Sequence, residues 1–380
     1  MELVRRNRDL RVDFFRGVAL WFILLDHIPG DVLNAFTLRN YVLNDATEVF
    51  VLLAGFAAGL TYGRTQDRHG WLFAAADVMK RVWLLYVAHI FLFVVFASQV
   101  GYAAAALDKA SYLEEIGLDP LSQAPYRALL DALTLRYQPA YLNVLPMYIA
   151  IMAGFAFALP LLRRPAVLAV CSFALYVAAR SFGWNLPTWR GGGWFFNPLT
   201  WQFLFVLGVL MGRGHLHLPT RLDRRWVDAL AVLLLLIGAA ILLVTWHRPD
   251  LRVHVPLPIA RVILRIDKGG MHPFRLISIL ALTWLTVRLV PAGARWVNAP
   301  AASPLVLVGQ HGLPVFCSGI FLAFLGRLAL ERWGGWPMQI LINAAGAAGL
   351  LGVAALGAWY RAKGAETKPR GPVAARPGGG

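Results

Sequence analysis

Long apolar runs, separated by short polar segments, recur from one end of the chain to the other. About 20 apolar residues suffice for an α-helix to cross a bilayer, and a helix satisfies its own backbone hydrogen bonds there. With 58% hydrophobic and 15% charged residues, the chain is too apolar for a soluble protein of this length. The sequence therefore predicts an all-α, polytopic transmembrane bundle. We count ten candidate spans, at about 12–29, 46–63, 79–100, 141–162, 166–183, 198–213, 226–246, 272–290, 304–326 and 338–360.

The basic residues predict how this bundle is oriented. If the N-terminus is cytoplasmic, the cytoplasmic segments hold twenty-one of the 36 Lys and Arg residues, against thirteen outside. Because positive residues favour the cytoplasmic side, both termini are expected there, in a multi-pass protein of the cytoplasmic membrane. The net charge of +16 is then a topology signal, and no nucleic-acid-binding module is visible.

The chain divides into one membrane domain, residues 1–361, and a tail, residues 362–380. The tail is rich in Gly, Pro and basic residues, a composition typical of disordered segments, so we expect it to be disordered and cytoplasmic. The histidines are scattered and both cysteines, Cys171 and Cys317, fall inside predicted spans. The sequence therefore predicts neither a metal site nor a disulfide framework.

The first predicted span holds four ionisable residues, and two of them, Arg16 and His27, have ten residues between them. At 100° per residue they share one helix face with Asp13, and they are separated by about 16 Å along the axis. Ionisable groups inside a membrane cost about 3 kcal/mol each and usually mark a substrate or proton path. An amphipathic helix on the membrane surface is the alternative, but positions 18–25 are apolar all round.

The second predicted span carries a glycine at every fourth position, Gly55, Gly59 and Gly63. Such a stripe lets another helix approach closely. If the first two spans pair antiparallel, Glu48 lies near His27, and a carboxylate there would fix the imidazole tautomer and raise its basicity. Asp26 is nearer in sequence but points about 100° away, so we expect Glu48 to be the partner. Two unrelated polar residues at the membrane ends remain the alternative.

Two long loops are predicted on the outer side. The loop 247–268 carries five cations, Arg248, Arg252, Arg261, Arg265 and Lys268. They are interpreted either as contacts to anionic headgroups or as a rim that attracts an anionic substrate. The loop 101–140 and its end carry several tyrosines, Tyr102, Tyr112, Tyr126, Tyr137 and Tyr141. Tyrosines stack on sugars, but we favour an aromatic belt at the membrane surface.

Six segments of the chain form one recognisable string: RDLRVDFFRGVALWFILLDHIPG, DATEVFVLLAGF, KRVWLLYVAHI, YLNVLPMYI, NPLTWQFLFVLG and LVGQHGLPVFCSG. Together they closely resemble the OpgC-type membrane proteins, which succinylate osmoregulated periplasmic glucans and are relatives of the acyltransferase-3 group. In that group an arginine or lysine with a histidine at the spacing of Arg16 and His27 is the functional pair of the first helix. The resemblance implies an enzyme of the bacterial inner membrane that uses acyl-CoA as a co-substrate and binds no permanent cofactor.

The resemblance assigns expected roles to the polar residues. His27 would be the general base, oriented by Glu48 or Asp26. Arg16, with Asp13 beside it, and Lys80 and Arg81 would bind the phosphates of the donor. Asn143, Gln310 and His311 would stabilise an oxyanion, although helix-kink packing explains them equally well. Arg261 and Arg265 would hold the glucan or the free carboxylate of a succinyl donor.

A transporter or flippase that uses the intramembrane Arg, Glu and His as a path is the alternative function. Its halves should show matching interrupted segments, and none is visible. Within the enzyme interpretation, the sequence leaves open succinyl or acetyl as the donor group, a cyclic or linear glucan as acceptor, and the oligomeric state. Besides these substrates, membrane lipids are the expected partners.

Overall fold

The computed structural model describes residues 9–216, 224–291 and 293–366, and within these ranges the fold is a helical bundle without β-strands. The longer helices are α1 (Leu10–Asp26), α2 (Ala46–His69), α3 (Trp71–Ala106), α7 (Val144–Ala158), α8 (Pro165–Phe182), α9 (Pro198–Gly212), α10 (Arg224–Leu242), α12 (Pro273–Leu289), α14 (Gly312–Trp333) and α15 (Gly335–Glu366). The shorter ones are α4 (Ser111–Ile116), α5 (Asp119–Gln123), α6 (Pro125–Leu133), α11 (Leu257–Ile263), α13 (Ser303–Gln310), the π-helix η4 (Leu243–His247) and the 3-10 helices η1 (Val32–Phe36), η2 (Leu38–Asn40), η3 (Leu159–Arg163), η5 (Pro249–His254), η6 (Arg295–Asn298) and η7 (Pro300–Ala302).

Every predicted span overlaps a helix, and the predicted all-helical membrane fold is confirmed. Seven helical segments in the described residues are long and apolar enough to cross a bilayer. Three predicted spans are not among these seven, because their helices are shorter than the 18 residues taken as the minimum for a span. Helices α1 and α12 have 17 residues each, and α9 has 15. The count of ten spans and the cytoplasmic termini therefore stay predictions.

Two boundaries differ from the sequence-based prediction. The predicted span 304–326 is broken at His311, where α13 ends and α14 begins. Pro314 is the third residue of α14, a position where its missing N–H costs no helical hydrogen bond. The predicted disordered tail is wrong for its first residues, because α15 continues to Glu366; residues 367–380 lie outside the described part.

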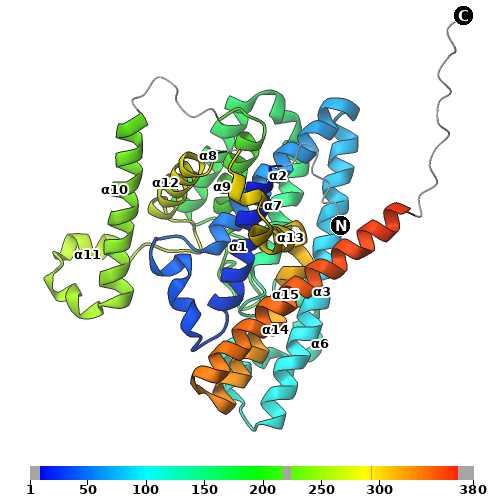
Figure 1. Ribbon diagram of the computed structural model, residues 1–380, viewed down its shortest axis with the longest axis vertical. Coiled ribbons are helices and arrows are strands. Elements are labelled where there is room, and N and C mark those ends of the chain that lie inside the picture. Colours follow the sequence, from blue (N-terminus) through cyan, green and yellow to red (C-terminus); the bar gives the residue numbers. More distant parts are fainter. Residues whose placement is uncertain (1–8, 217–223, 292, 367–380) are drawn as a thin grey trace, which may run out of the picture.

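The outer surface of the bundle is apolar over long stretches. On α10, large side chains such as Trp226, Leu230, Leu233 and Leu236 are exposed, and α3 likewise exposes Trp83, Leu84, Val87 and Phe91. Patches of this size on a monomer mark contact with lipid or with another protein. Figure 1 shows α10 and α11 projecting at one side, while α1 lies in the middle of the bundle.

Glycines set the two closest helix crossings. A Cβ built on Gly55 of α2 would lie 2.1 Å from the carbonyl oxygen of Phe205 in α9. One built on Gly208 of α9 would lie 2.2 Å from that of Leu52. Any side chain would push these backbones apart, so the predicted stripe does receive a closely packed helix, and that helix is α9.

The second crossing joins α1 to α13 and fixes the polar residues of both. A Cβ on Gly17 would lie 2.0 Å from the carbonyl oxygen of Leu305, and one on Gly309 would lie 1.8 Å from that of Asp13. This close approach brings Gln310 against Asp13. The glycines thus determine what surrounds the N-terminal half of α1.

Candidate functional site

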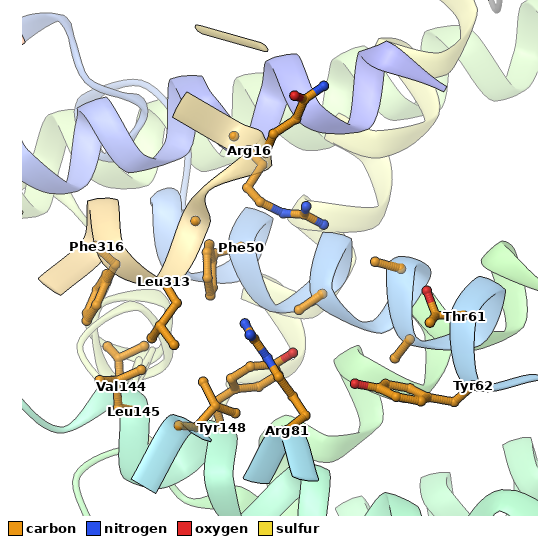
Figure 2. A pocket seen from close by; sticks show the side chains of 17 residues that line it. Arg16, Phe50, Thr61, Tyr62, Arg81, Val144, Leu145, Tyr148, Leu313 and Phe316 are labelled. Carbon is orange, nitrogen blue, oxygen red and sulfur yellow. The ribbon is translucent and has the colours of Figure 1, made fainter. Parts of the chain in front are cut away.

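A cavity of about 190 Å³ lies between α1, α2, α3, α7 and the junction of α13 and α14. Arg16 of α1 and Arg81 of α3 extend into it from opposite walls (Figure 2). Thr61 and Tyr62 lie at one end, and Phe50 with Phe316 lies at the other, beyond the two arginines (Figure 2). Two guanidinium groups that face each other in an otherwise largely apolar space form a site for a polyanion.

Arg16 is held in place by its surroundings. Its guanidinium lies 3.6 Å from the carboxylate of Asp13, which is buried, and donates a hydrogen bond to the carbonyl oxygen of Leu53. Gln310 donates to the second carboxylate oxygen of Asp13 over 3.4 Å. The structure therefore makes Asp13 and Gln310 supports of Arg16. Asp13 was predicted as a substrate-binding residue, but its negative charge faces Arg16.

The predicted donor-binding cations are only partly brought together. Arg16 and Arg81 share the cavity, but Lys80 is exposed and is not among the residues that line it. Consecutive residues of a helix point about 100° apart, so Lys80 and Arg81 cannot both face the same cavity. Lys80 could contact a ligand only outside it.

His27 is the residue that ends α1, and its ring is partly buried. Its Nδ1 donates to the carbonyl oxygen of Ile23, one turn earlier, over 2.6 Å. Because a carbonyl oxygen can only accept, this bond leaves Nε2 with its lone pair. In the described part of the chain no hydrogen-bond partner of Nε2 is found. The imidazole is thus already in the tautomer that a general base needs.

The prediction that Glu48 orients His27 is corrected, since Ile23 performs this role. Glu48 caps its own helix by accepting from the backbone N–H of Asp45 over 3.0 Å, in a capping box. Its other oxygen accepts from Arg275 Nε over 2.7 Å. Asp26 does not contact His27 either, because its carboxylate accepts from the hydroxyl of Thr37 over 2.6 Å. Both carboxylates are engaged elsewhere.

Glu48 belongs to a charged cluster that joins the N-termini of α2 and α12. Asp45 pairs with Lys268 and lies 3.8 Å from Arg275, which also pairs with Glu48. Burial alone would raise the pKa of Asp45, but the charges of Lys268 and Arg275 outweigh it and hold that pKa well below its usual range. Lys268, predicted as part of the basic loop, is therefore a structural ion-pair partner.

Tyr141 lies beside His27, a position that the sequence analysis did not predict for it. Its ring lies edge-on to the imidazole, with centroids 4.7 Å apart, and also contacts Phe96 at 6.2 Å. Its φ of 71° is strained for a non-glycine residue, and such strain concentrates at functional sites. The belt prediction is wrong for it and for the buried Tyr112 and Tyr137. The unusual φ leaves no signal in the sequence.

The remaining polar residues lie apart from the cavity. His311 is buried, its Nδ1 bonds the carbonyl oxygen of Leu307 over 3.0 Å, and its ring packs against Gly357 of α15. Asn143 precedes α7 and is two residues from Tyr141, but it is not a lining residue of the cavity. No group of three or more His, Cys, Asp or Glu suited to a metal ion occurs among the described residues.

The predicted basic rim is present in part. Arg248 pairs with Asp250, and Arg252 donates to backbone carbonyl oxygens. Arg261 and Arg265 are exposed, and no ion pair to either is found within the described ranges. They lie on and beside α11, where Leu257 and Leu264 are also exposed. Two arginines are thus available to an anionic partner.

If the protein has the acyltransferase activity that the resemblance implies, neutralising Arg261 and Arg265 together, as Arg261→Gln with Arg265→Gln, should raise the apparent KM for the acceptor or shift preference from succinyl to acetyl donors. Turnover should persist, because both residues are remote in sequence and contact from His27 and Arg16. Exposed charges are screened beyond about 8 Å at physiological ionic strength, so added salt should reduce the effect. Kinetics with both donors at low and high salt check this. Wild-type constants in all four conditions would leave the loop as a headgroup contact.

Comparison with protein families gives a match that agrees with the resemblance noted from the sequence. Over residues 8–362 the chain matches the model of the family described as OpgC protein. No curated protein and no solved structure matches it. The match covers nearly the whole chain, including every candidate residue named above, and agrees with the expectation of a membrane acyltransferase in glucan modification. The chain belongs to the OpgC protein family.

Proposed function

We propose that this protein is a membrane O-acyltransferase that moves a succinyl or other short acyl group from cytoplasmic acyl-CoA to a hydroxyl of periplasmic glucan. The observation that carries the proposal is the arrangement along α1. Arg16 faces Arg81 across a cavity, and His27 follows about 16 Å further along the same helix. A cationic site at one level and a base at another suit a donor that enters from one side and an acceptor that arrives from the other.

The donor would lie along this axis. Coenzyme A is polyanionic, and its phosphates would bind between Arg16 and Arg81, where bidentate contacts are possible. Its pantetheine arm would extend past Phe50 and Phe316 toward the end of α1. The thioester would then lie beside His27. The apolar walls favour the arm over water, which would otherwise hydrolyse the donor.

The chemistry needs one base and no covalent intermediate on the protein. Nε2 of His27 would take the proton of the sugar hydroxyl as the oxygen attacks the thioester carbonyl. This attack would form the C–O bond and give a tetrahedral oxyanion, which would collapse to the ester carbonyl with cleavage of the C–S bond. The leaving thiolate would receive the proton from His27. Free CoA and the acylated glucan are the products, and the enzyme returns to its starting state.

The expected oxyanion donors need revision under this proposal. Gln310 bonds Asp13 at the level of Arg16, about three turns from His27, so it is too distant from the thioester. His311 packs on α15. Asn143 is the remaining candidate, since it is close in sequence to Tyr141, which contacts His27. We therefore assign oxyanion stabilisation to Asn143.

Mass spectrometry of periplasmic glucans tests the proposal in cells. Glucans from cells with the protein should carry ester-linked acyl groups, and glucans from cells without it should lack them. The mass of the group also identifies the donor, because succinyl and acetyl additions differ. Identical glucans in both strains would reject the proposed acceptor.

A further inference from the structure

His89 of α3 is fully buried, with 0% of its surface exposed, and neither ring nitrogen has a hydrogen-bond partner among the residues that the structure describes. Buried polar groups are nearly always paired, and an unpaired one carries the full cost of losing water. The other two histidines of this region, His27 and His311, each bond a backbone carbonyl one turn earlier. His89 makes no such bond, although the carbonyl of Leu85 stands at the same spacing. Both nitrogens are thus left for a ligand.

The position of His89 indicates which ligand that is. Residues 81, 85, 89 and 96 recur on one face of α3, at intervals of one or two helical turns. Arg81 and Leu85 line the cavity, and His89 follows Leu85 by one turn. Phe96, two turns further, contacts Tyr141, whose ring contacts His27. Measured along the helix, His89 lies about 12 Å beyond Arg81 and about 10 Å before Phe96. It is therefore between the arginine pair and the candidate base.

We propose that His89 binds the pantetheine arm of the acyl-CoA donor, as the arm passes from the cavity toward His27. This inference rests on the proposed function and adds a binding residue to it. A neutral imidazole offers one donor and one acceptor, and each amide of the pantetheine arm offers the complementary pair. Leu85, one turn before His89, is an apolar wall of the cavity, so an amide that passes it would otherwise lose its hydrogen bonds. Contact between the two would satisfy the hydrogen-bonding groups of both the pantetheine amide and the imidazole.

Binding measurements with two probes separate the arm from the phosphates. The probes are CoA and 3′-phosphoadenosine 5′-diphosphate, which carries the phosphates of CoA without the pantetheine arm. In His89→Leu, the affinity for CoA should fall roughly three- to tenfold, the value of one or two net hydrogen bonds, with the affinity for the nucleotide unchanged. Arg81→Gln should weaken both probes. His89→Gln, which keeps a donor and an acceptor, should retain most of the CoA affinity.

Phe91→Leu is the matched control, because Phe91 is two residues away on α3 and 69% exposed; it should bind both probes as the wild type does. His89→Leu with wild-type CoA affinity, or with an equal loss for both probes, would overturn the inference. If His89→Leu does not fold, His89→Gln is the deciding variant. A His89→Gln protein that loses as much affinity for both probes as Arg81→Gln does would contradict a contact to the arm. Wild-type protein that binds neither probe would instead reject the proposed donor.

Discussion

Replacing His27 with Ala is expected to abolish acyl transfer while leaving donor binding intact. General base catalysis contributes about 10²- to 10⁴-fold, and the loss of kcat should be of that order. His27 ends α1 with Nδ1 bonded to Ile23 and Nε2 open, and its side chain does not line the cavity of Arg16. Transfer of labelled acyl groups to glucan and CoA binding, measured on the same purified variant, check both parts.

An exposed histidine provides the control. His215 is exposed and lies outside the helices, and His215→Ala should transfer acyl groups at the wild-type rate. If the His27→Ala protein retains near-normal transfer, His27 is not the base. If the His27→Ala protein loses CoA binding as well as acyl transfer, His27 instead maintains the structure of the donor site.

Arg16→Ala is expected to weaken CoA binding by about 10- to 100-fold, the value of one charge-assisted hydrogen-bonded contact. Arg16→Lys keeps the charge but loses the planar fork, so its affinity should be intermediate. Glucan binding should not change in either variant, because Arg16 lies about three turns from His27. Calorimetric titration with CoA and with glucan measures the two affinities.

Another arginine of the same helix makes this test specific. Arg11 pairs with Asp9 and lines a different, apolar groove between α1 and α12. Arg11→Ala should therefore leave the CoA affinity unchanged. If Arg16→Ala also binds CoA as tightly as the wild type does, Arg16 serves only as the ion-pair partner of Asp13.

Features encoded locally could be predicted from the sequence. The apolar runs give the helices, and the repeated glycines of α2 give a close crossing, although the partner of Gly55 in α9, Phe205, is 150 positions away. The spacing of Asp45 and Glu48 is that of a capping box, a local signal that explains Glu48 without His27. The sequence-based pairing of Glu48 with His27 missed this competing role.

Features that depend on tertiary packing could not be predicted. The ion pair of Glu48 with Arg275 joins residues 227 positions apart, and no local pattern in the sequence indicates it. The side-chain rotamer that bonds His27 to Ile23 leaves no trace in residue spacing. Neither does the left-handed backbone of Tyr141 or the burial of His89. Ile23 and Tyr141 are the contacts of the candidate base, so its immediate surroundings were the least predictable part of the fold.

The most direct test of the central claim is transfer across a membrane by the purified protein. Vesicles that contain the protein and enclose succinyl-CoA would be supplied with glucan outside, and both compartments would be analysed by mass spectrometry. Our account predicts succinylated glucan outside, an equal amount of free CoA inside, and neither product with His27→Ala. Succinyl-CoA that crosses unchanged, or glucan that enters without being acylated, would contradict it and favour a transporter.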